Sequence, residues 1–316
     1  MLWADEPDVM ATLSHRLLWQ GVLAFFVASS ALSPGESGDS AHATYRSTAS
    51  EVRLTFFTTD QHNRSVNQLQ KNDFAVVDNG LVVRDFRSFT QSNVTQLDLL
   101  LLVDCSESVL PQFRREISDV LRLASQTQAI AEDHVAIVSF GGHEPRVVCA
   151  GDCMTSTAAG QLAATAANGQ TPLFDAVRFA ADFLAKHHDP ETRPVLILFS
   201  DGEDTISRSS ARDAIEAALT AETQIYAVDL GRSATSEGTD TLREMATATG
   251  GRYFTVQDGT ARALRAALDD LHAGYIVTYK LPSREAGFHS VRILPTHNMN
   301  LQFRCRYGYH YAGQVR

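Results

Sequence analysis

Between residues 97 and 271, short apolar runs alternate with amphipathic segments. The apolar runs have the length of strands and read LDLLLLVD, HVAIVSF, PVLILFSD, QIYAVDLG and RYFTV. The segments with helical periodicity are 111–125, 173–186, 209–220, 239–247 and 260–272. Nearly continuous apolar strands between amphipathic helices are typical of a parallel sheet that is covered on both faces. We therefore predict an α/β fold with a doubly wound, mostly parallel sheet.

The segments on either side of this block alternate in the manner of antiparallel strands. Residues 51–89 include DFAVVDNGLVVRDF, in which Asn79-Gly80 is a strong hairpin signal. Residues 275–311 contain the strand-like runs YIVTYKL, HSVRILPT and LQFRCRYGYHY. Neither segment alone supplies a stable core, because isolated hairpins are marginal in water.

We therefore predict that residues 44–93 pack with residues 274–316 as a smaller β-sandwich-like domain. The α/β domain, residues 94–273, would be inserted between them. The aromatic residues expected to share the core of the smaller domain are Phe56, Phe74, Phe86, Tyr275, Tyr279 and Phe303.

Residues 1–43 are predicted to be a signal peptide or anchor followed by a linker. The apolar stretch Leu17–Leu32 fits a secretory signal better than a membrane span, which needs about 20 residues. Acidic residues come before it where a signal peptide has positive charge, which favours Met10 over Met1 as the start. Cleavage is expected between residues 32 and 44, and the alternatives are an uncleaved anchor or a buried helix. We expect an exported protein (periplasmic, cell-envelope or extracellular) that meets a membrane only through an uncleaved N-terminal segment.

Charge and cysteine content exclude two classes of protein. Lys and Arg number 27 against 37 Asp and Glu, which gives a net charge of −10. An acidic chain without a basic run is a poor nucleic-acid binder. The chain has 4 cysteines, too few for a disulfide scaffold. Cys149 and Cys153 are expected to form a local disulfide in an oxidising compartment. A zinc site that includes His143 is the alternative, but a fourth ligand is not evident.

Oxygen-bearing side chains follow the ends of predicted strands. The first strand of the α/β block runs into a loop with acidic and hydroxyl residues, and so does the PVLILF strand. In open α/β sheets ligands bind at the carboxyl ends of the strands, and hard oxygen donors suit Mg²⁺ or Mn²⁺. Taken singly, the acidic residues can equally be helix N-caps. The predicted metal ligands are Asp104, Ser106, Ser108, Thr171 and Asp201.

This set of residues resembles the metal-ion-dependent adhesion site of von Willebrand factor type A domains. The surrounding sequence segments also match this family. They are LLLLVDCSESV, GQTPLFDAV and LILFSDGEDT. The flanks resemble the acidobacterial-type VWFA-related bacterial proteins, which have the patterns LxxxDFxVxDNG and RxGYxY. Here residues 69–80 read LQKNDFAVVDNG and residues 306–311 read RYGYHY. The resemblance covers roughly residues 50 to 312.

The resemblance implies a noncatalytic protein that binds a protein ligand through a divalent cation. The partner's Glu or Asp would complete the coordination of the cation, and Glu107 would add negative charge beside it. No phosphate-binding loop or nucleophile elbow is present, and Ser106 replaces the second acid of an aspartyl-phosphate phosphatase loop. We therefore predict that the protein is not an enzyme. The alternative function is a structural cell-envelope assembly component with a vestigial metal site.

Overall fold

The computed structural model describes residues 51–109, 133–142, 144–151, 153, 160–161, 169–187, 189, 191–231, 236–256 and 259–313. All of them belong to one compact unit, Tyr45–Arg316. The predicted signal segment, the helix predicted at 111–125 and His143 lie outside the described residues.

None of the helices in the described part of the chain combines the length and the apolar character that crossing a membrane requires.

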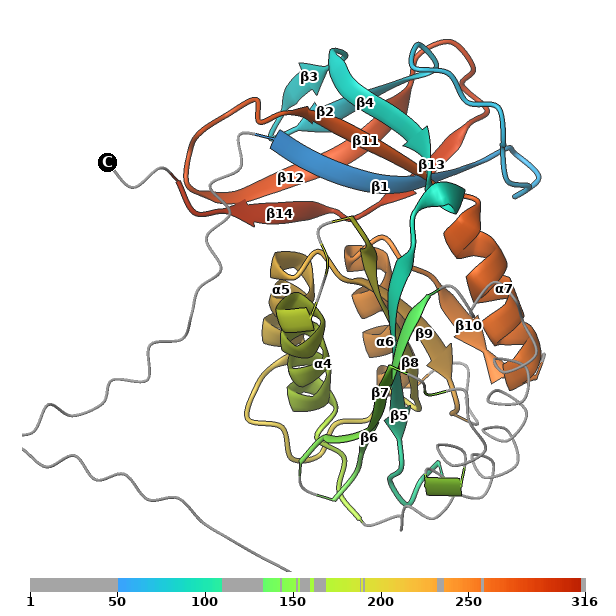
Figure 1. The fold of residues 1–316 in the computed structure, drawn as a ribbon, viewed down its shortest axis with the longest axis vertical. Coiled ribbons are helices and arrows are strands. Elements are labelled where there is room, and N and C mark those ends of the chain that lie inside the picture. Colours follow the sequence, from blue (N-terminus) through green and yellow to red (C-terminus); the bar gives the residue numbers. More distant parts are fainter. Residues whose placement is uncertain are drawn as a thin grey trace, which may run out of the picture. The chain divides into compact units, whose positions relative to one another are not determined.

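A six-stranded sheet forms the centre of the α/β part, in the order β10-β9-β8-β5-β6-β7 (Figure 1). Neighbouring strands are parallel except β7, which runs antiparallel to β6 at one edge. The central strands β5 and β8 are buried along their whole length, which agrees with their continuous apolar sequences. The strands are β5 (Leu97–Asp104), β6 (His134–Phe140), β7 (Arg146–Gly151), β8 (Arg193–Ser200), β9 (Gln224–Asp229) and β10 (Tyr253–Thr255).

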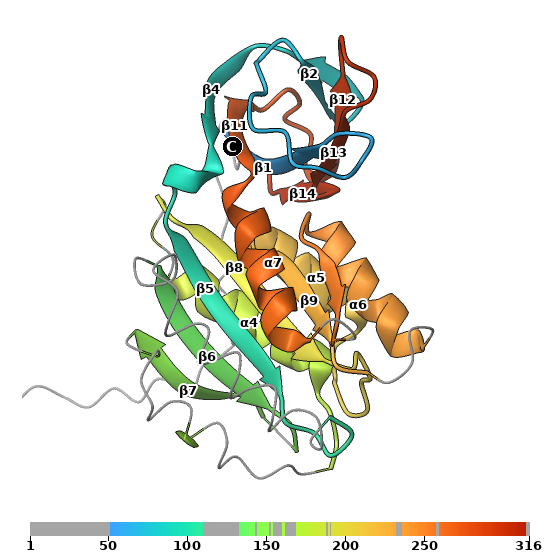
Figure 2. The same ribbon diagram turned by 90° about the vertical axis from the view of Figure 1, so that its right-hand side faces the viewer.

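Helices cover both faces of this sheet, as Figure 2 shows. One apolar cluster joins the sheet to α4, α5 and α6, and another joins its opposite face to α7. The helices are α4 (Leu173–His187), α5 (Ala211–Thr220), α6 (Glu237–Ala248) and α7 (Thr260–His272). Helix α5 begins at a capping box in which Ser210 and Asp213 satisfy each other's backbone N–H groups.

The segments that flank the α/β part form two four-stranded antiparallel sheets. Their strand orders are β13-β1-β11-β4 and β14-β12-β2-β3. Strand β1 lies between β11 and β13, and β2 pairs with β12, so each sheet combines strands from both ends of the described chain. The strands are β1 (Glu51–Thr59), β2 (Phe74–Asp78), β3 (Leu81–Val83), β4 (Phe86–Gln91), β11 (Tyr275–Lys280), β12 (Gly287–Pro295), β13 (Gln302–Cys305) and β14 (Gly308–Tyr311), and the 3-10 helix η1 (Ser92–Val94) joins β4 to β5.

An aromatic core holds these two sheets together. Phe56, Phe74 and Phe86 from the first flank are buried with Tyr275 and Tyr279 from the second. The ring centroids of Phe56 and Phe74 lie 4.9 Å apart, and those of Phe56 and Tyr275 lie 5.6 Å apart. The predicted fold class is therefore confirmed: a doubly wound, mostly parallel sheet with a smaller β-sandwich-like part made from both flanks.

The hairpin between β2 and β3 has the turn that its sequence predicts. Asp78 pairs with Leu81, so the loop has only Asn79 and Gly80. Their φ angles are 48° and 83°, the left-handed values that a type I′ turn requires at both positions. Asn and Gly adopt these values more readily than other residues.

Candidate functional site

The loop after β5 curls back onto the end of its own strand. The backbone N–H of Ser106 donates to Asp104 Oδ1 at 2.8 Å, a local turn of the kind that Asp favours. The N–H of Cys105 donates to the Phe140 carbonyl at 2.7 Å, which continues the pairing of β5 with β6 beyond Asp104. Asp104 and Ser106 are fully buried. Both residues are therefore held firmly where the loop begins.

The loop after β8 meets this loop through side-chain hydrogen bonds. Ser108 Oγ donates to Asp201 Oδ2 at 2.6 Å, and the hydroxyl oxygens of Ser106 and Ser108 lie 3.2 Å apart. Ser200 Oγ donates to Asp104 Oδ2 at 2.6 Å. Strands β5 and β8 are neighbours in the sheet, so their carboxyl ends lie side by side. The structure thus brings Asp104, Ser106, Ser108 and Asp201 into one network.

Thr171 lies on a third loop, just before α4. Its backbone N–H donates to Thr205 Oγ1 at 2.6 Å, and its carbonyl accepts from the N–H of Thr205 at 2.9 Å. Thr205 lies on the same loop as Asp201, so Thr171 is fastened to that loop. Within the described residues, the Thr171 hydroxyl makes no hydrogen bond to the other predicted ligands.

The buried carboxylate of Asp104 is costly to ionise in this site. Burial raises the pKa of Asp104 to about 6, although the hydrogen bonds from Ser200 and Ser106 oppose the rise, and the charge of Asp201 adds to it. Two carboxylates that share a buried site favour a cation between them. Carboxylate and hydroxyl oxygens are the donors that Mg²⁺ and Mn²⁺ accept, so the residues present fit such an ion.

Hydroxyl groups would supply much of the coordination of that ion. Among the described residues, no group of three or more His, Cys, Asp and Glu side chains is arranged to hold a metal. Cys105, between two predicted ligands, is a poor ligand because burial raises the pKa of its thiol to about 12.

The first turn of α6 packs closely against the backbone of the loop that contains Asp201. A Cβ atom on Gly238, in the first turn of α6, would lie 2.4 Å from the Asp201 carbonyl oxygen. A Cβ atom on Gly202 would lie 2.1 Å from the Gly238 carbonyl oxygen, and Gly202 has a φ of +81°. Only glycine allows this approach of α6 to the loop after β8.

Sequence reasoning missed Ser200 and Thr205. Ser200 orients Asp104, and Thr205 holds Thr171. The available signal for Ser200 is its place at the end of an apolar strand, directly before Asp201. Asp204 accepts from Ser207 Oγ at 2.5 Å and from the N–H of Phe174 at 3.3 Å, and so helps to fix the start of α4.

The predicted disulfide between Cys149 and Cys153 is confirmed. It joins β7 to the residues that follow it. Cys105 and Cys305 are free thiols, the first buried and the second half-buried.

Comparisons with solved structures give similar chains of low sequence identity. An aerotolerance-related membrane protein from Bacteroides fragilis is 15% identical, covers 55% of this chain and 98% of its own, and has a TM-score of 0.44. BatB from Bacteroides thetaiotaomicron is 17% identical, covers 55% of this chain and 97% of its own, and has a TM-score of 0.43. A von Willebrand factor type A protein from Catenulispora acidiphila is 14% identical, covers 76% of this chain and 74% of its own, and has a TM-score of 0.44.

The search of curated proteins gives no match. The family profile described as "von Willebrand factor type A domain" matches residues 98–270, which is more than half of the 316 residues. The protein therefore belongs to the von Willebrand factor type A domain family.

Proposed function

We propose that the protein binds a partner protein through a divalent cation at the carboxyl ends of β5 and β8. Von Willebrand factor type A domains often mediate protein interactions. The observation that carries the proposal is the hydrogen-bonded network of Asp104, Ser106, Ser108 and Asp201, in which carboxylate and hydroxyl oxygens from two loops converge. Hard oxygen donors of this kind suit Mg²⁺ or Mn²⁺.

Each residue has a distinct part in this proposal. Ser106, Ser108 and Thr171 bind the ion directly or nearly so, and Asp104 and Asp201 act partly through water. The ion supplies a positive charge and an open position for a Glu or Asp of the partner. Ser200 keeps Asp104 in one orientation by its hydrogen bond. The protein is noncatalytic, as domains of this family generally are.

We place the protein outside the cytoplasm, in the periplasm, the cell envelope or the extracellular space. The support is the apolar segment Leu17–Leu32, which has the length of a secretory signal. Any contact with a membrane is made by that segment if it stays uncleaved. The disulfide of Cys149 and Cys153 is compatible with an oxidising compartment.

Isothermal titration of Mg²⁺ and Mn²⁺ tests the metal site directly. We expect saturable binding by the wild type and loss of affinity by roughly tenfold or more in Asp104→Ala and Asp201→Ala, because each change removes a carboxylate. Asp182→Ala is the matched control, since Asp182 is exposed on α4. Thermal unfolding of each variant shows whether the fold is kept. Unchanged affinity in both site variants would place the cation elsewhere.

A pull-down from envelope extract, with and without EDTA, tests the partner. We expect a protein that is retained with Mg²⁺ and released by EDTA, and that Asp104→Ala fails to retain. If the wild type is folded but binds neither Mg²⁺ nor Mn²⁺, the alternative function applies: a structural envelope component with a vestigial metal site.

A further inference from the structure

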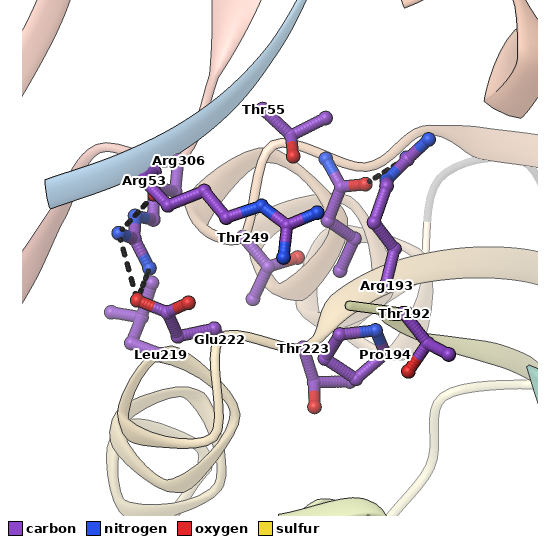
Figure 3. Close-up of a pocket in the computed structure, with 11 residues that line it drawn as sticks. Arg53, Thr55, Thr192, Arg193, Pro194, Leu219, Glu222, Thr223, Thr249 and Arg306 are labelled. Carbon is purple, nitrogen blue, oxygen red and sulfur yellow. Dashed lines mark hydrogen bonds and ion pairs between the residues drawn. The ribbon is translucent and has the colours of Figure 1, made fainter. Parts of the chain in front are cut away.

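A polar cavity lies at the amino ends of β8 and β9, away from the loops of the proposed metal site. Its volume is about 40 Å³. Arg193 and Gln224 are the first residues of β8 and β9, and both line it. Arg53 lines it from β1, and Arg306 lines it from the loop between β13 and β14. The cavity thus lies between the α/β part and the flanking sheets (Figure 3).

The described residues that line this cavity have an excess of positive charge. They include three arginines, Arg53, Arg193 and Arg306, and one carboxylate, Glu222. Glu222 forms an ion pair with Arg306. Its Oε1 lies 3.3 Å from Arg306 Nη1 and 3.2 Å from Arg306 Nη2. A left-handed backbone, with a φ of 52°, directs Glu222 to this position after α5. The remaining lining side chains, mainly hydroxyls and an amide, carry no negative charge.

Arg193 makes its hydrogen bonds to neutral acceptors. Its Nη1 donates to the Leu271 carbonyl at 3.0 Å, and its Nη2 donates to Gln224 Oε1 at 2.8 Å. Burial lowers the pKa of Arg193 to about 10, and the nearby charge of Arg53 adds to this shift. Tyr226 and the carboxylates of Asp270 and Asp133 oppose it. A buried guanidinium beside another cation favours an anion in contact with it.

Three buried donors on the lining side chains find no acceptor among the described residues. They are Arg193 Nε, Gln224 Nε2 and Arg306 Nε. The exposed fractions of these residues are 4%, 6% and 8%. Buried donors are nearly always paired in proteins, so such a group of exceptions calls for a ligand that accepts hydrogen bonds. In Figure 3 the side chain of Arg53 extends across the middle of the same lining.

We propose that this cavity binds a small inorganic oxyanion, phosphate or sulfate. A tetrahedral oxyanion offers several acceptors at once, and guanidinium groups are its usual partners in proteins. A cavity of about 40 Å³ has room for about three water-sized positions, which matches a small ion and excludes a nucleotide or a peptide. Thr55 and Thr249 add hydroxyl groups to the lining.

The bound oxyanion would join the two parts of the molecule. Arg53 comes from the flanking sheets, whereas Arg193 and Gln224 come from the central sheet. An ion between them contacts side chains from both parts and stabilises the folded protein by an amount that grows with the logarithm of its concentration above the dissociation constant. This role is independent of the proposed metal site, which lies at the carboxyl ends of β5 and β8, whereas the cavity lies at the amino ends of β8 and β9.

Titration of phosphate, and separately of sulfate, into the whole protein tests the proposal at constant ionic strength set with NaCl. Binding is followed by calorimetry and by the midpoint of thermal unfolding. We expect saturation at millimolar oxyanion in the wild type, and a loss of affinity by roughly tenfold or more in Arg53→Gln. Arg87→Gln makes the same charge change on the exposed surface of β4 and should bind as the wild type does. The phosphate and sulfate arms show which oxyanion is preferred.

Two outcomes would overturn the proposal. Phosphate and sulfate stabilise many proteins without a site, by exclusion from their surface. A rise in the midpoint that is equal in the wild type, Arg53→Gln and Arg87→Gln, with no saturable heat of binding in the wild type, would be this general effect. Equal affinity in Arg53→Gln and the wild type would place the ion elsewhere. If Arg53→Gln does not fold, Arg53→Lys keeps the charge without the planar fork and should still bind more weakly than the wild type.

Discussion

At the scale of single residues, the buried Asp78 holds the two flanking sheets together. Its Oδ2 accepts hydrogen bonds from Tyr279 at 2.8 Å and from Tyr309 at 2.7 Å, and its side chain has no exposed surface. Burial, together with the charge and hydrogen bond of Asp78, raises the pKa of both tyrosines, so both stay neutral donors. His289 lies beside the pair, with its Nδ1 3.3 Å from the Tyr309 hydroxyl. The sequence motif of each flanking segment therefore contributes to one buried network, the first through Asp78 and the second through Tyr309.

Replacing Asp78 should destabilise the protein more than removing one of its tyrosine hydroxyls. Asp78→Ala leaves the buried Tyr279 hydroxyl without its acceptor and the Tyr309 hydroxyl with only His289 Nδ1 at 3.3 Å, and we expect a loss of about 3 kcal/mol in the free energy of unfolding. Tyr309→Phe removes only one hydrogen bond and should cost about 1 kcal/mol. Urea unfolding followed by far-UV circular dichroism measures both, with Asp85→Ala as an exposed control. Similar losses in Asp78→Ala and Asp85→Ala would contradict this role.

At the scale of elements, the approach of α6 to the loop after β8 is as important as the loop residues themselves. Gly238 and Gly202 meet there with no space for a side chain, and the Asp201 carbonyl oxygen is part of the same contact. The start of α6 is also fixed by Ser236, whose Oγ accepts from the N–H of Thr239 at 3.1 Å. The position of Asp201 therefore depends on a helix that contributes no predicted ligand.

Gly238→Ala should weaken the proposed Mg²⁺ site without touching a ligand. The added Cβ would lie 2.4 Å from the Asp201 carbonyl oxygen, so the loop or the helix has to move. We expect a loss of stability of about 1–3 kcal/mol and weaker Mg²⁺ binding. Gly160→Ala adds the same atom where nothing lies within 4 Å and serves as the control. If both variants bind Mg²⁺ as the wild type does, α6 does not position Asp201.

At the scale of the whole molecule, the sequence predicts the sheets and the helices that cover them better than it predicts the side-chain contacts between these elements. The strands β5 and β8 could be predicted because burial on both faces demands continuous apolar runs. Strand β7 was missed because its residues are exposed or half-buried, so no such run marks it. The loops of the candidate site could be predicted because parallel strands end at one edge. The sequence could not predict the hydrogen-bond partners Ser200 and Thr205 or the cavity lined by arginines. These features depend on side chains from segments that are distant in the sequence.

Arg304 of β13 joins the flanking sheets to the α/β part. Its Nη1 donates to the carbonyls of Gly250 and Gly251 at 2.5 and 2.9 Å, and its Nη2 lies 2.5 Å from Asp270 Oδ2. Its guanidinium also packs over the ring of Phe57, 4.1 Å from the centroid. These bonds tie one flanking strand to the end of α7 and to the turn before β10, so both parts should unfold together.

We therefore expect a single calorimetric unfolding transition, with equal calorimetric and van't Hoff enthalpies. Arg304→Met keeps much of the apolar side chain but removes the positive charge that faces the Asp270 carboxylate. This change should lower the midpoint by about 5–10 °C, and the flanking sheets and the α/β part should then unfold in two separate transitions. Arg292→Met, on the exposed face of β12, removes the same charge and should leave one transition near the wild-type midpoint. Two transitions in the wild type would show that the two parts unfold independently and that the contacts of Arg304 do not couple them.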